Sequence, residues 1–523
     1  MRTFRGAWSL AGLAAGAAGL AASYFVAMAM TLRDSPVVAV ADLVVRLTPG
    51  PVAHYLIEQV GHLDKPLLLL GIFVVLAIVF AWAGRLARRT WWAPAIVYGA
   101  LTAVGAVAVS QERGATTVDF VPVAVGFVTW LVTLSLLTEP LRRAELAAAR
   151  PTPADEGEPD RLQPAPVSPG HSRRTFVIRA GLVAAAAAVV GVAGKVVGRS
   201  RRHVEESRLL LRLPKVSEPV VPTAVRVGVK GVTPWETPNA EFYRIDTSFV
   251  VPAIEPRDWQ LRIHGKVDRE LTLTYEQLLA RQFTEAWLTL CCVSNEVGGD
   301  LISNAWFSGV RLADLLAEAG PHPDADAVLQ TSDDGWTCGT PLSALTDGRN
   351  AMLAVAMNGD PLPLEHGFPV RTVVPGLYGY VSACKWVVDM EVTNFSEISA
   401  YWTERGWSEK GPVKLSSRVD VPRSGAEVPS GTVRFGGVAW AQHTGISGVE
   451  FAVDGGEWTA AEIAWVPNDD TWVQWKGVAD VEQGDHTVRV RAIDKTGQVQ
   501  TGVEHDVIPD GATGWDSSDF TCT

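Results

Sequence analysis

The stretch Leu288-Thr-Leu-Cys-Cys-Val-Ser-Asn-Glu-Val-Gly-Gly-Asp-Leu301 joins an apolar run, a pair of cysteines and a turn rich in polar residues and glycine. The apolar run predicts a buried β-strand that ends at the cysteines. Glycines let the backbone approach a bound molecule closely, so a thiol beside them is well placed for chemistry. A buried strand with two ordinary core cysteines would leave the same pattern, because free cysteine is often buried. The stretch alone therefore leaves both interpretations open.

The residues on either side of this stretch predict a mixed α and β domain from about Leu213 to Lys414. Trp259 to His264 alternates apolar and polar residues, as strands do, and Tyr275 to Arg281 predicts a short helix. After the cysteines, Asn304-Ala-Trp-Phe-Ser-Gly-Val-Arg-Leu312 leads into a helix predicted from Leu312 to Ala319. The cysteine pair therefore lies inside a domain built of both helices and strands.

The composition limits the class of protein. A chain of 523 residues can hold about two to four domains. The chain is mildly acidic, with 45 basic and 57 acidic residues, which argues against a nucleic-acid partner. The cysteines are too few and too irregularly spaced for a disulfide framework, and no C-x-x-C pair indicates zinc or an iron–sulfur cluster. They are Cys291, Cys292, Cys338, Cys384 and Cys522.

Four long apolar runs occupy residues 1–140, and each has about the length needed to cross a bilayer. They are Leu10 to Met30, Pro66 to Gly84, Trp91 to Ser110 and Val118 to Thr138. Arginines gather after the second run and after the fourth, so the positive-inside rule places these two loops and the N-terminus in the cytoplasm. The sequence thus predicts a four-helix transmembrane region.

The segment Ser35 to Leu63 then falls outside the membrane; it is amphipathic in places and carries His54 and His62. The apolar runs contain no histidine, so a haem held by two histidines between helices is not expected. The runs also lack the acidic and basic residues that mark ion pathways. We therefore interpret the region as an anchor or docking platform rather than a transporter.

Residues 141–176 are expected to form a cytoplasmic linker, since Pro151 to Gly170 is rich in proline, acidic and small residues. The linker ends in Ser172-Arg-Arg-Thr-Phe-Val177, a twin-arginine export pattern, and the next apolar run predicts a fifth transmembrane helix at residues 177–198. Ordinary cytoplasmic charge beside a membrane span would look the same. The export interpretation makes this a multi-pass protein of the cell membrane, with everything after Gly198 outside the cytoplasm. The arginines that follow Gly198 count against that orientation.

Between residues 199 and 415 the chain resembles the sulfite oxidase family of molybdopterin oxidoreductases, and the matching motifs fall in the family's order. They are Thr237-Pro-Asn-Ala-Glu-Phe-Tyr-Arg244, Cys292-Val-Ser-Asn295, Asn304-Ala-Trp-Phe-Ser-Gly-Val-Arg-Leu312, Met357-Asn-Gly-Asp-Pro-Leu-Pro-Leu-Glu-His-Gly-Phe-Pro-Val-Arg371, and Val374-Pro-Gly376 followed by Lys385-Trp386. The resemblance implies an α+β domain and a Mo-molybdopterin cofactor with a single pterin. It also implies that one cysteine thiolate binds molybdenum, and soft sulfur ligands suit such a metal.

The family's Cys-x-x-Asn spacing decides which cysteine is the ligand. Cys292 with Asn295 keeps the spacing, whereas Cys291 with Ser294 does not. Successive side chains of an extended segment also point to opposite faces, so only one of the two thiols can face the metal. The resemblance therefore implies that Cys292 is the catalytic metal ligand, and we expect Cys291 on the packed side of the strand.

The resemblance carries further residues over as cofactor contacts. They are Asn239, Phe242, Tyr243, Arg244, Asn295, Asp334, His366, Arg371 and Lys385. His366 and Arg371 would hold the pyran and phosphate region, and Lys385 the phosphate terminus; a guanidinium can bind phosphate bidentately, which lysine cannot do. Solvated surface charge is the alternative for the two cations, and a turn-forming Asp-Gly is the alternative for Asp334.

Two departures from the family pattern concern the substrate. Sulfite oxidases carry arginines directly after Cys-x-x-Asn, and this chain has Glu296 and Val297 there. They also carry a Tyr-Lys-Gly near the end of the domain, where this chain places Trp407. A site without these arginines and with a carboxylate nearby should bind the sulfite dianion poorly.

Residues 416–523 contain short alternating strands separated by turn signals such as Asp454-Gly-Gly456, which predict an all-β immunoglobulin-like sandwich. The strands are expected at Val433 to Trp440, Gly448 to Asp454, Thr471 to Trp475 and His486 to Ala492. The region resembles the family's dimerisation domain, so a homodimer is possible, and a packing module without a partner is the alternative. The tail Pro509 to Trp515 is expected to be irregular, and Cys522 receives no role.

The sequence thus favours a membrane-anchored molybdenum oxidoreductase that transfers an oxygen atom to or from a small extracytoplasmic substrate. Because the chain shows no haem, flavin or iron–sulfur motif, electrons would leave through another protein or quinone. One alternative is a reductase of sulfoxides, such as oxidised methionine in exported proteins. Another is a cofactor-free membrane scaffold, against which Cys292, His366 and Arg371 argue.

Overall fold

The structure of the protein, a computed structural model, describes residues 6–30, 32, 34–49, 52, 63–112, 115–149, 169–197 and 200–523. It divides into two compact units. The first comprises Met1–His203 with Ser248–Val250, and the second comprises Val204–Thr247 with Val251–Thr523. Each unit has apolar cores of its own.

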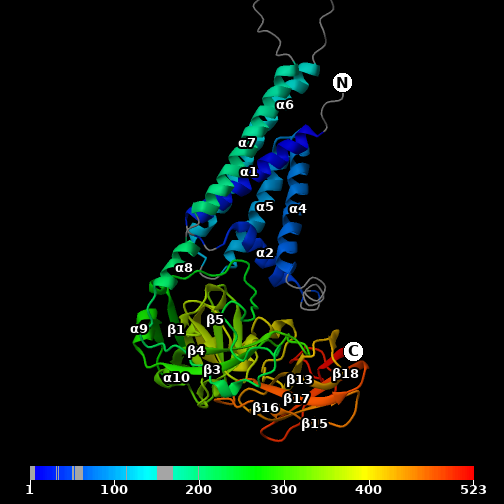
Figure 1. The fold of residues 1–523 in the computed structure, drawn as a ribbon. Coiled ribbons are helices and arrows are strands. Elements are labelled where there is room, and N and C mark those ends of the chain that lie inside the picture. The colour runs from blue at the N-terminus through cyan, green and yellow to red at the C-terminus, as the bar shows by residue number, and fades with distance from the viewer. Residues whose placement is uncertain are drawn as a thin grey trace, which may run out of the picture. The chain divides into compact units, whose positions relative to one another are not determined.

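The described part of the first unit is helical (Figure 1). Its helices are α1 (Ala7–Ala29), α2 (Pro36–Leu47), α4 (Asp64–Leu86), α5 (Trp92–Ser110), η2 (Thr117–Phe120), α6 (Val121–Ala149) and α7 (Pro169–Val197); α8 (Ser200–Leu210) leads into the second unit. By length and composition, five helices within the described residues could cross a membrane, namely Ala7–Ala29, Asp64–Leu86, Trp92–Ser110, Thr117–Leu146 and Arg174–Lys195. Each predicted span lies on one of them.

Close backbone contact joins these helices. A Cβ added at Gly12 of α1 would lie 2.8 Å from the backbone nitrogen of Gly84 in α4, so the pair must be small. Phe80, Tyr98 and Trp130 fill the adjoining space, with ring centroids 5.3 to 6.0 Å apart.

Helices occupy both ends of the predicted linker at residues 141–176. α6 continues to Ala149 and α7 begins at Pro169, so the twin-arginine pattern at Ser172 to Val177 lies within a helix. The remainder of the linker lies outside the described residues, as do His54 and His62.

The second unit begins with a mixed α/β domain built on two sheets (Figure 1). The first sheet has the order β2-β1-β10-β5-β6 and is antiparallel except where β1 pairs with β10. Its strands are β1 (Gln260–Gly265), β2 (Leu271–Thr274), β5 (Ala327–Ser332), β6 (Thr337–Pro341) and β10 (Val387–Thr393).

The second sheet carries the cysteine pair and has the order β3-β4-β7-β8, with β9 also paired to β7. Its strands are β3 (Thr284–Cys291), β4 (Ile302–Arg311), β7 (Met352–Met357), β8 (Asp360–Pro361) and β9 (Arg371–Val373). The helices of the domain are short: α9 (Tyr275–Ala280), α10 (Leu312–Ala319), α11 (Leu342–Thr346), α12 (Gly379–Ser382), η3 (Thr223–Val225), η4 (Pro256–Asp258), η5 (Leu364–His366), η6 (Phe395–Glu397) and η7 (Thr403–Arg405). The strands at β1 and β3 and the helices at α9 and α10 lie where the sequence predicts them.

The C-terminal domain is all-β and packs two sheets face to face. One has the order β11-β13-β17-β16 and the other β12-β19-β18-β14-β15. The strands are β11 (Ser416–Val421), β12 (Ala426–Val428), β13 (Gly431–Trp440), β14 (Ile446–Val453), β15 (Thr459–Ala460), β16 (Glu462–Ile463), β17 (Val473–Val481), β18 (Gly484–Asp494) and β19 (Ser517–Cys522). Phe435 from one sheet lies against Phe451 from the other, with ring centroids 5.2 Å apart. All four predicted strands are present, whereas β11, β12, β15, β16 and β19 were not expected.

A loop of the all-β domain covers the outer edge of β3. The Thr289 backbone N–H donates to the Asp470 carbonyl (2.9 Å), and the Trp472 N–H donates to the Thr289 hydroxyl (2.8 Å). The Asn468 side chain adds a bond to the Trp287 carbonyl (3.1 Å). An uncovered edge strand would present unpaired backbone groups. The two domains of this unit are therefore joined at the strand that carries the thiols.

Candidate active site

Cys292 stands directly after β3, at the start of a braced turn. Its N–H donates to the Leu301 carbonyl (2.9 Å), and its carbonyl accepts from the Asn295 N–H (3.1 Å). The Asn295 side-chain oxygen accepts from the Leu301 N–H (2.8 Å). Asn295 thus holds the glycine-rich loop closed beneath the thiol.

The surroundings of the Cys292 sulfur suit a thiolate that is bound to a metal. Burial raises the pKa of the Cys292 thiol, while hydrogen bonds from the backbone and hydroxyl of Ser294 and the backbone of Val293 oppose that rise. Backbone N–H groups directed at a sulfur stabilise its charged form, and metal binding removes the proton.

Phe242, Tyr243, His366, Arg371 and Lys385 lie together beside this thiol, and this group is called the cradle below. Phe242 forms its aromatic wall. Its ring stacks on Tyr243 (5.5 Å between centroids) and lies edge-on to His366 (5.4 Å). The Ser303 hydroxyl accepts from the Tyr243 N–H (3.1 Å) and ties this wall to β4. Burial, followed by the nearby charge of Cys292, raises the pKa of Tyr243 well above its usual range. The segment around Phe242 therefore lies close to the thiol, as the resemblance implies.

The side chain of Asn358 holds Asn239 in place. Asn358 lies in the Asn-Gly turn after β7 and has a left-handed φ of 52°. The Asn358 amide donates to the side-chain oxygen of Asn239 and to the Thr237 carbonyl, both at 2.9 Å. Asn358 was not among the predicted site residues, although it stands in the quoted motif. Its role is to fix the segment that carries Asn239.

His366 is buried and its Nδ1 atom has no hydrogen-bond partner within the described residues. Burial lowers the pKa of His366 to about 3, and the positive charges of Lys385 and Arg371 act in the same direction. A neutral imidazole with one free nitrogen is suited to bond a ligand placed in the cradle.

Arg371 and Lys385 are both buried, which is costly for charged groups. Burial lowers the pKa of Arg371 to about 10 and the pKa of Lys385 to about 8. Asp246 pairs with Lys385 (3.4 Å) and with Arg244 (2.9 Å). Arg244, Arg371 and Lys385 thus form a group of three cations. The Asp246 carboxylate pairs with only two of them, Arg244 and Lys385. The excess positive charge fits an anionic group such as a phosphate.

The conformation of Gly367 allows the chain segments that carry Arg371 and Lys385 to lie close together. Its φ of 106° lies in the left-handed region, and an added Cβ would lie 3.0 Å from Arg371 Cβ and 3.1 Å from Lys385 Cα. The His-Gly-Phe-Pro motif therefore needs glycine for the close approach of these two chain segments.

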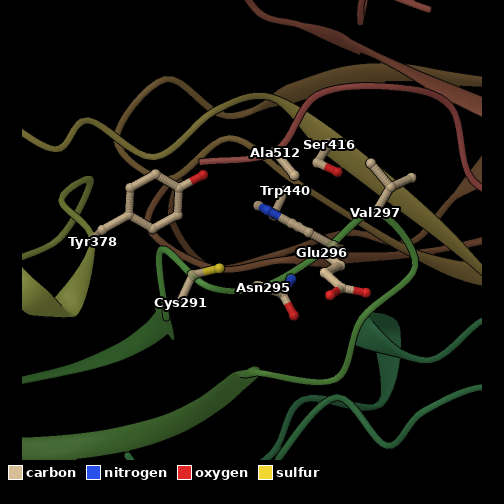
Figure 2. A pocket seen from close by; sticks show the side chains of 8 residues that line it. All are labelled: Cys291, Asn295, Glu296, Val297, Tyr378, Ser416, Trp440 and Ala512. Atoms are coloured by element: carbon tan, nitrogen blue, oxygen red, sulfur yellow. The ribbon is translucent and has the colours of Figure 1, made fainter. Parts of the chain in front are cut away.

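Cys291 is buried within the apolar core of the domain, as expected. It also lines a small pocket of about 10 Å³, in which the hydroxyl of Tyr378 and the sulfur point toward the same space and the indole of Trp440 lies opposite (Figure 2). The other lining residues are Asn295, Glu296, Val297, Ser416 and Ala512. Glu296 and Val297, which replace the family's arginines, thus stand on the pocket wall.

Asp334 and Trp407 belong neither to the cradle nor to the pocket lining. The Asp334 carboxylate accepts from the Trp336 N–H (3.1 Å), which is the turn-forming arrangement given above as its alternative role. Trp407 is buried against Tyr380 (5.8 Å between centroids) and Trp402 (6.3 Å). The phenol on the pocket wall comes instead from Tyr378, which the sequence analysis did not single out.

Fold and site together fit one class of protein: a cofactor-dependent enzyme, with a single thiol suited to a metal and a cationic cradle suited to an anionic organic group. Comparison with known proteins agrees. Residues 248–402 match the family model described as oxidoreductase molybdopterin binding domain. The chain belongs to the sulfite oxidase family of molybdopterin oxidoreductases, is an oxidoreductase, and has Mo-molybdopterin as its cofactor.

Two relatives and one solved structure illustrate the match. Mitochondrial sulfite oxidase of Mus musculus is 30% identical over 319 residues, which cover 50% of this chain and 57% of that protein. The uncharacterized oxidoreductase YuiH of Bacillus subtilis is 34% identical over 153 residues, 29% of this chain and 74% of that one. The sulfane dehydrogenase SoxCD from Paracoccus pantotrophus superposes with a TM-score of 0.46 and 25% identity, covering 57% of this chain and 82% of its own. The chain spans little more than half the length of mouse sulfite oxidase.

The residues present fit this cofactor. The free His366 nitrogen and the excess positive charge of Arg244, Arg371 and Lys385 suit a pterin with a phosphate tail. The Cys292 sulfur, with N–H donors around it, suits the metal.

Proposed function

We propose that this protein is a membrane-anchored molybdenum oxidoreductase that transfers an oxygen atom to or from a small extracytoplasmic substrate in a two-electron reaction. The observation that carries the proposal is the Cys292 thiol beside a buried cradle with excess positive charge. When bound, the cofactor supplies the redox chemistry, and the protein binds and orients it.

Each side chain has a distinct part in this proposal. Cys292 binds the metal. Arg371, Lys385 and Arg244 bind the phosphate end, as the charge excess around Asp246 supports. The residues proposed to hold the pterin are Asn239, Phe242, Tyr243 and His366; Asn295 braces the metal-bearing loop, and Asp334 is kept as a further contact that the resemblance implies.

The proposed location is the cell membrane, with the catalytic domain outside the cytoplasm. Five described helices of sufficient length and apolarity support the anchor, and the twin-arginine pattern at Ser172 to Val177 supports export of a folded domain. Electrons would pass to an electron-transfer protein or quinone. The all-β domain would act as an immunoglobulin-like module for a homodimer, a role supported by its two packed sheets.

Reduction of an uncharged sulfoxide is the second candidate reaction. The lining of the pocket beside the cysteine pair favours it, because Glu296 and Val297 occupy the positions of the family's arginines. Sulfite is a dianion and would meet a carboxylate there. The cofactor-free scaffold has no comparable support, since the cradle is complete.

Metal and pterin analysis of the purified full-length protein tests the main proposal. We expect near-stoichiometric molybdenum and pterin in the wild type and in Cys291→Ala, and loss of molybdenum together with activity in Cys292→Ala. The matched alanine variants separate the ligand from its neighbour on the same strand end. Wild-type protein without molybdenum would falsify the proposal, and metal loss in Cys291→Ala alone would reassign the ligand.

A further inference from the structure

Two buried cysteines adjoin the cradle, and the proposed function gives them no role. Cys338 belongs to β6, and Cys384 follows α12. Both residues are 0% exposed. The two thiols are hydrogen-bonded to each other, and burial together with this bond raises the pKa of Cys384 well above its usual range. Two sulfurs already in contact need little movement to form a disulfide.

The strand register directs the Cys338 side chain toward Cys384. Cys338 lies opposite Gln330 in the pairing of β6 with β5, so the two side chains share one face of the sheet. Thr340, two residues further along β6, shares that face. Its hydroxyl donates to the Val381 carbonyl in α12 and accepts from the Gln330 amide (2.7 Å). This face of β6 therefore lies against α12, which leads directly to Cys384.

Cys384 is also tied to the segments that carry the two buried cations. Its N–H donates to the Thr372 hydroxyl, and the Thr372 N–H donates to the Cys384 carbonyl, both at 2.9 Å. Thr372 follows Arg371 in the chain, and Cys384 precedes Lys385. The thiol pair is thus connected through one residue to each cation of the cradle.

Oxidation of these thiols requires the cradle to open. Because both are fully buried, a dissolved oxidant reaches them only when the Cys384 segment moves away from Thr372. A cofactor held by Arg371 and Lys385 binds the closed arrangement, so it lowers the population of the open form. In the empty cradle these two cations repel each other, which favours opening.

We propose that Cys338 and Cys384 are a loading-sensitive disulfide site: they form a disulfide in protein with an empty cradle and remain thiols in protein that holds the cofactor. The inference rests on the proposed binding of the cofactor by Arg371 and Lys385. It gives the chain a covalent mark of unloaded protein.

Thiol–disulfide exchange forms the bond. One thiolate of the pair attacks a sulfur of an external disulfide and releases the first thiol; the second thiolate then attacks the sulfur of the first and releases the other thiol. The two cysteines lose two electrons and two protons, and the external disulfide gains them as it becomes two thiols. The oxidant is a small-molecule or protein disulfide, which belongs to the oxidising environment outside the cytoplasm.

Cross-linking of loaded and unloaded protein tests the inference. Full-length protein is purified in loaded form, and in unloaded form from a host that does not make the pterin. Both are incubated with oxidised glutathione, the remaining thiols are blocked with N-ethylmaleimide, and mass spectrometry quantifies the peptides joined at Cys338 and Cys384. We expect cross-linking to be about tenfold or more slower in the loaded protein, as a ligand present at about ten times its dissociation constant allows.

Cys522 provides the internal control, because it is a buried thiol of β19 in the all-β domain and lies outside the cradle. Its rate of modification by oxidised glutathione should be the same in both samples. Equal cross-linking rates in the two samples, absence of the cross-link from the unloaded protein, or an equal change at Cys522 would overturn the inference.

Two variants of Thr372 extend the test within loaded protein. Thr372→Val removes the hydroxyl that accepts from the Cys384 N–H and should speed cross-linking by about tenfold, since a buried donor is left unpaired. Thr372→Ser keeps the hydroxyl and should cross-link like the wild type. Equal rates in the two variants would contradict the proposed opening.

Pterin and molybdenum content of the same samples reports on the proposed function. Loaded wild type that cross-links as fast as unloaded protein overturns only this inference. Wild type that holds neither pterin nor molybdenum overturns both.

Discussion

The two sides of the cysteine pair carry opposite electrostatics. On the cradle side, Arg371 and Lys385 are buried with excess positive charge, which favours an anionic ligand. On the pocket side, Glu296 stands among aromatic and small side chains without a basic lining residue. The two charge patterns can lie close together at one strand end because they come from different segments of the chain.

Arg418→Met should have the largest effect, because it removes the clamp that the Arg418 guanidinium forms between the pocket loop, at the Gly299 carbonyl (2.7 Å), and the all-β domain. Asp420 would remain buried without its partner, and breaking a buried ion pair costs about 3–5 kcal/mol. Thermal or urea unfolding of the full-length protein measures this loss.

Arg434→Met on the exposed face of β13 is the matched control and should change stability by less than about 0.5 kcal/mol. Similar stabilities of the two variants would show that the clamp does not hold the pocket wall.

Lys385 gives the cradle a pH dependence that the pocket should lack. Its pKa is lowered to about 8 by burial, so above that pH the cradle loses a positive charge and should retain the anionic cofactor less well. We expect affinity to fall by up to about tenfold per pH unit between pH 8 and 10. Pterin retained after dialysis, measured by the fluorescence of its oxidised form, follows the change.

Lys385→Arg is the informative comparison, since guanidinium stays charged over this range. Its retention profile should be flat. A parallel decline in both proteins would mean that another group controls cofactor release.

The smallest effect is expected in the all-β domain, far along the chain from both features. The carboxylate of Asp454 raises the pKa of His486 above its ordinary value. The folded form therefore binds the proton more tightly than the unfolded chain, so this stabilisation is complete below about pH 6.5 and is lost as pH rises through the folded pKa. The difference in thermal midpoint between wild type and His486→Gln should shrink over that window. A constant difference would contradict the pairing.

Local patterns in the sequence predicted the elements that carry the site. The apolar run before Cys291 forms β3, because a strand buried on both faces has consecutive apolar residues. Leu312 to Ala319 forms α10, because its apolar residues recur with helical periodicity. The motif residues Phe242, His366, Arg371 and Lys385 are brought together near Cys292.

What escaped prediction depends on contacts between distant segments. Ser416 and Trp440 of the all-β domain lie around one small pocket with Cys291, and only the folded domains create that pocket. Asp246 pairs with Lys385 although 139 positions separate them, and no local pattern marks such a partner. β19 ends at Cys522, in a tail with weak alternation, because pairing with β18 decides its conformation.

The loop that covers the edge of β3 has a consequence for the order of events during synthesis. The bond between Thr289 and Trp472 joins residues 183 positions apart. Because the ribosome makes β3 long before the loop that covers it, the thiol-bearing strand keeps one unpaired edge until Trp472 has emerged. A nascent chain truncated before Asn468 would therefore expose this edge to other strands, and stable loading of metal and pterin should begin only after the covering loop has been made.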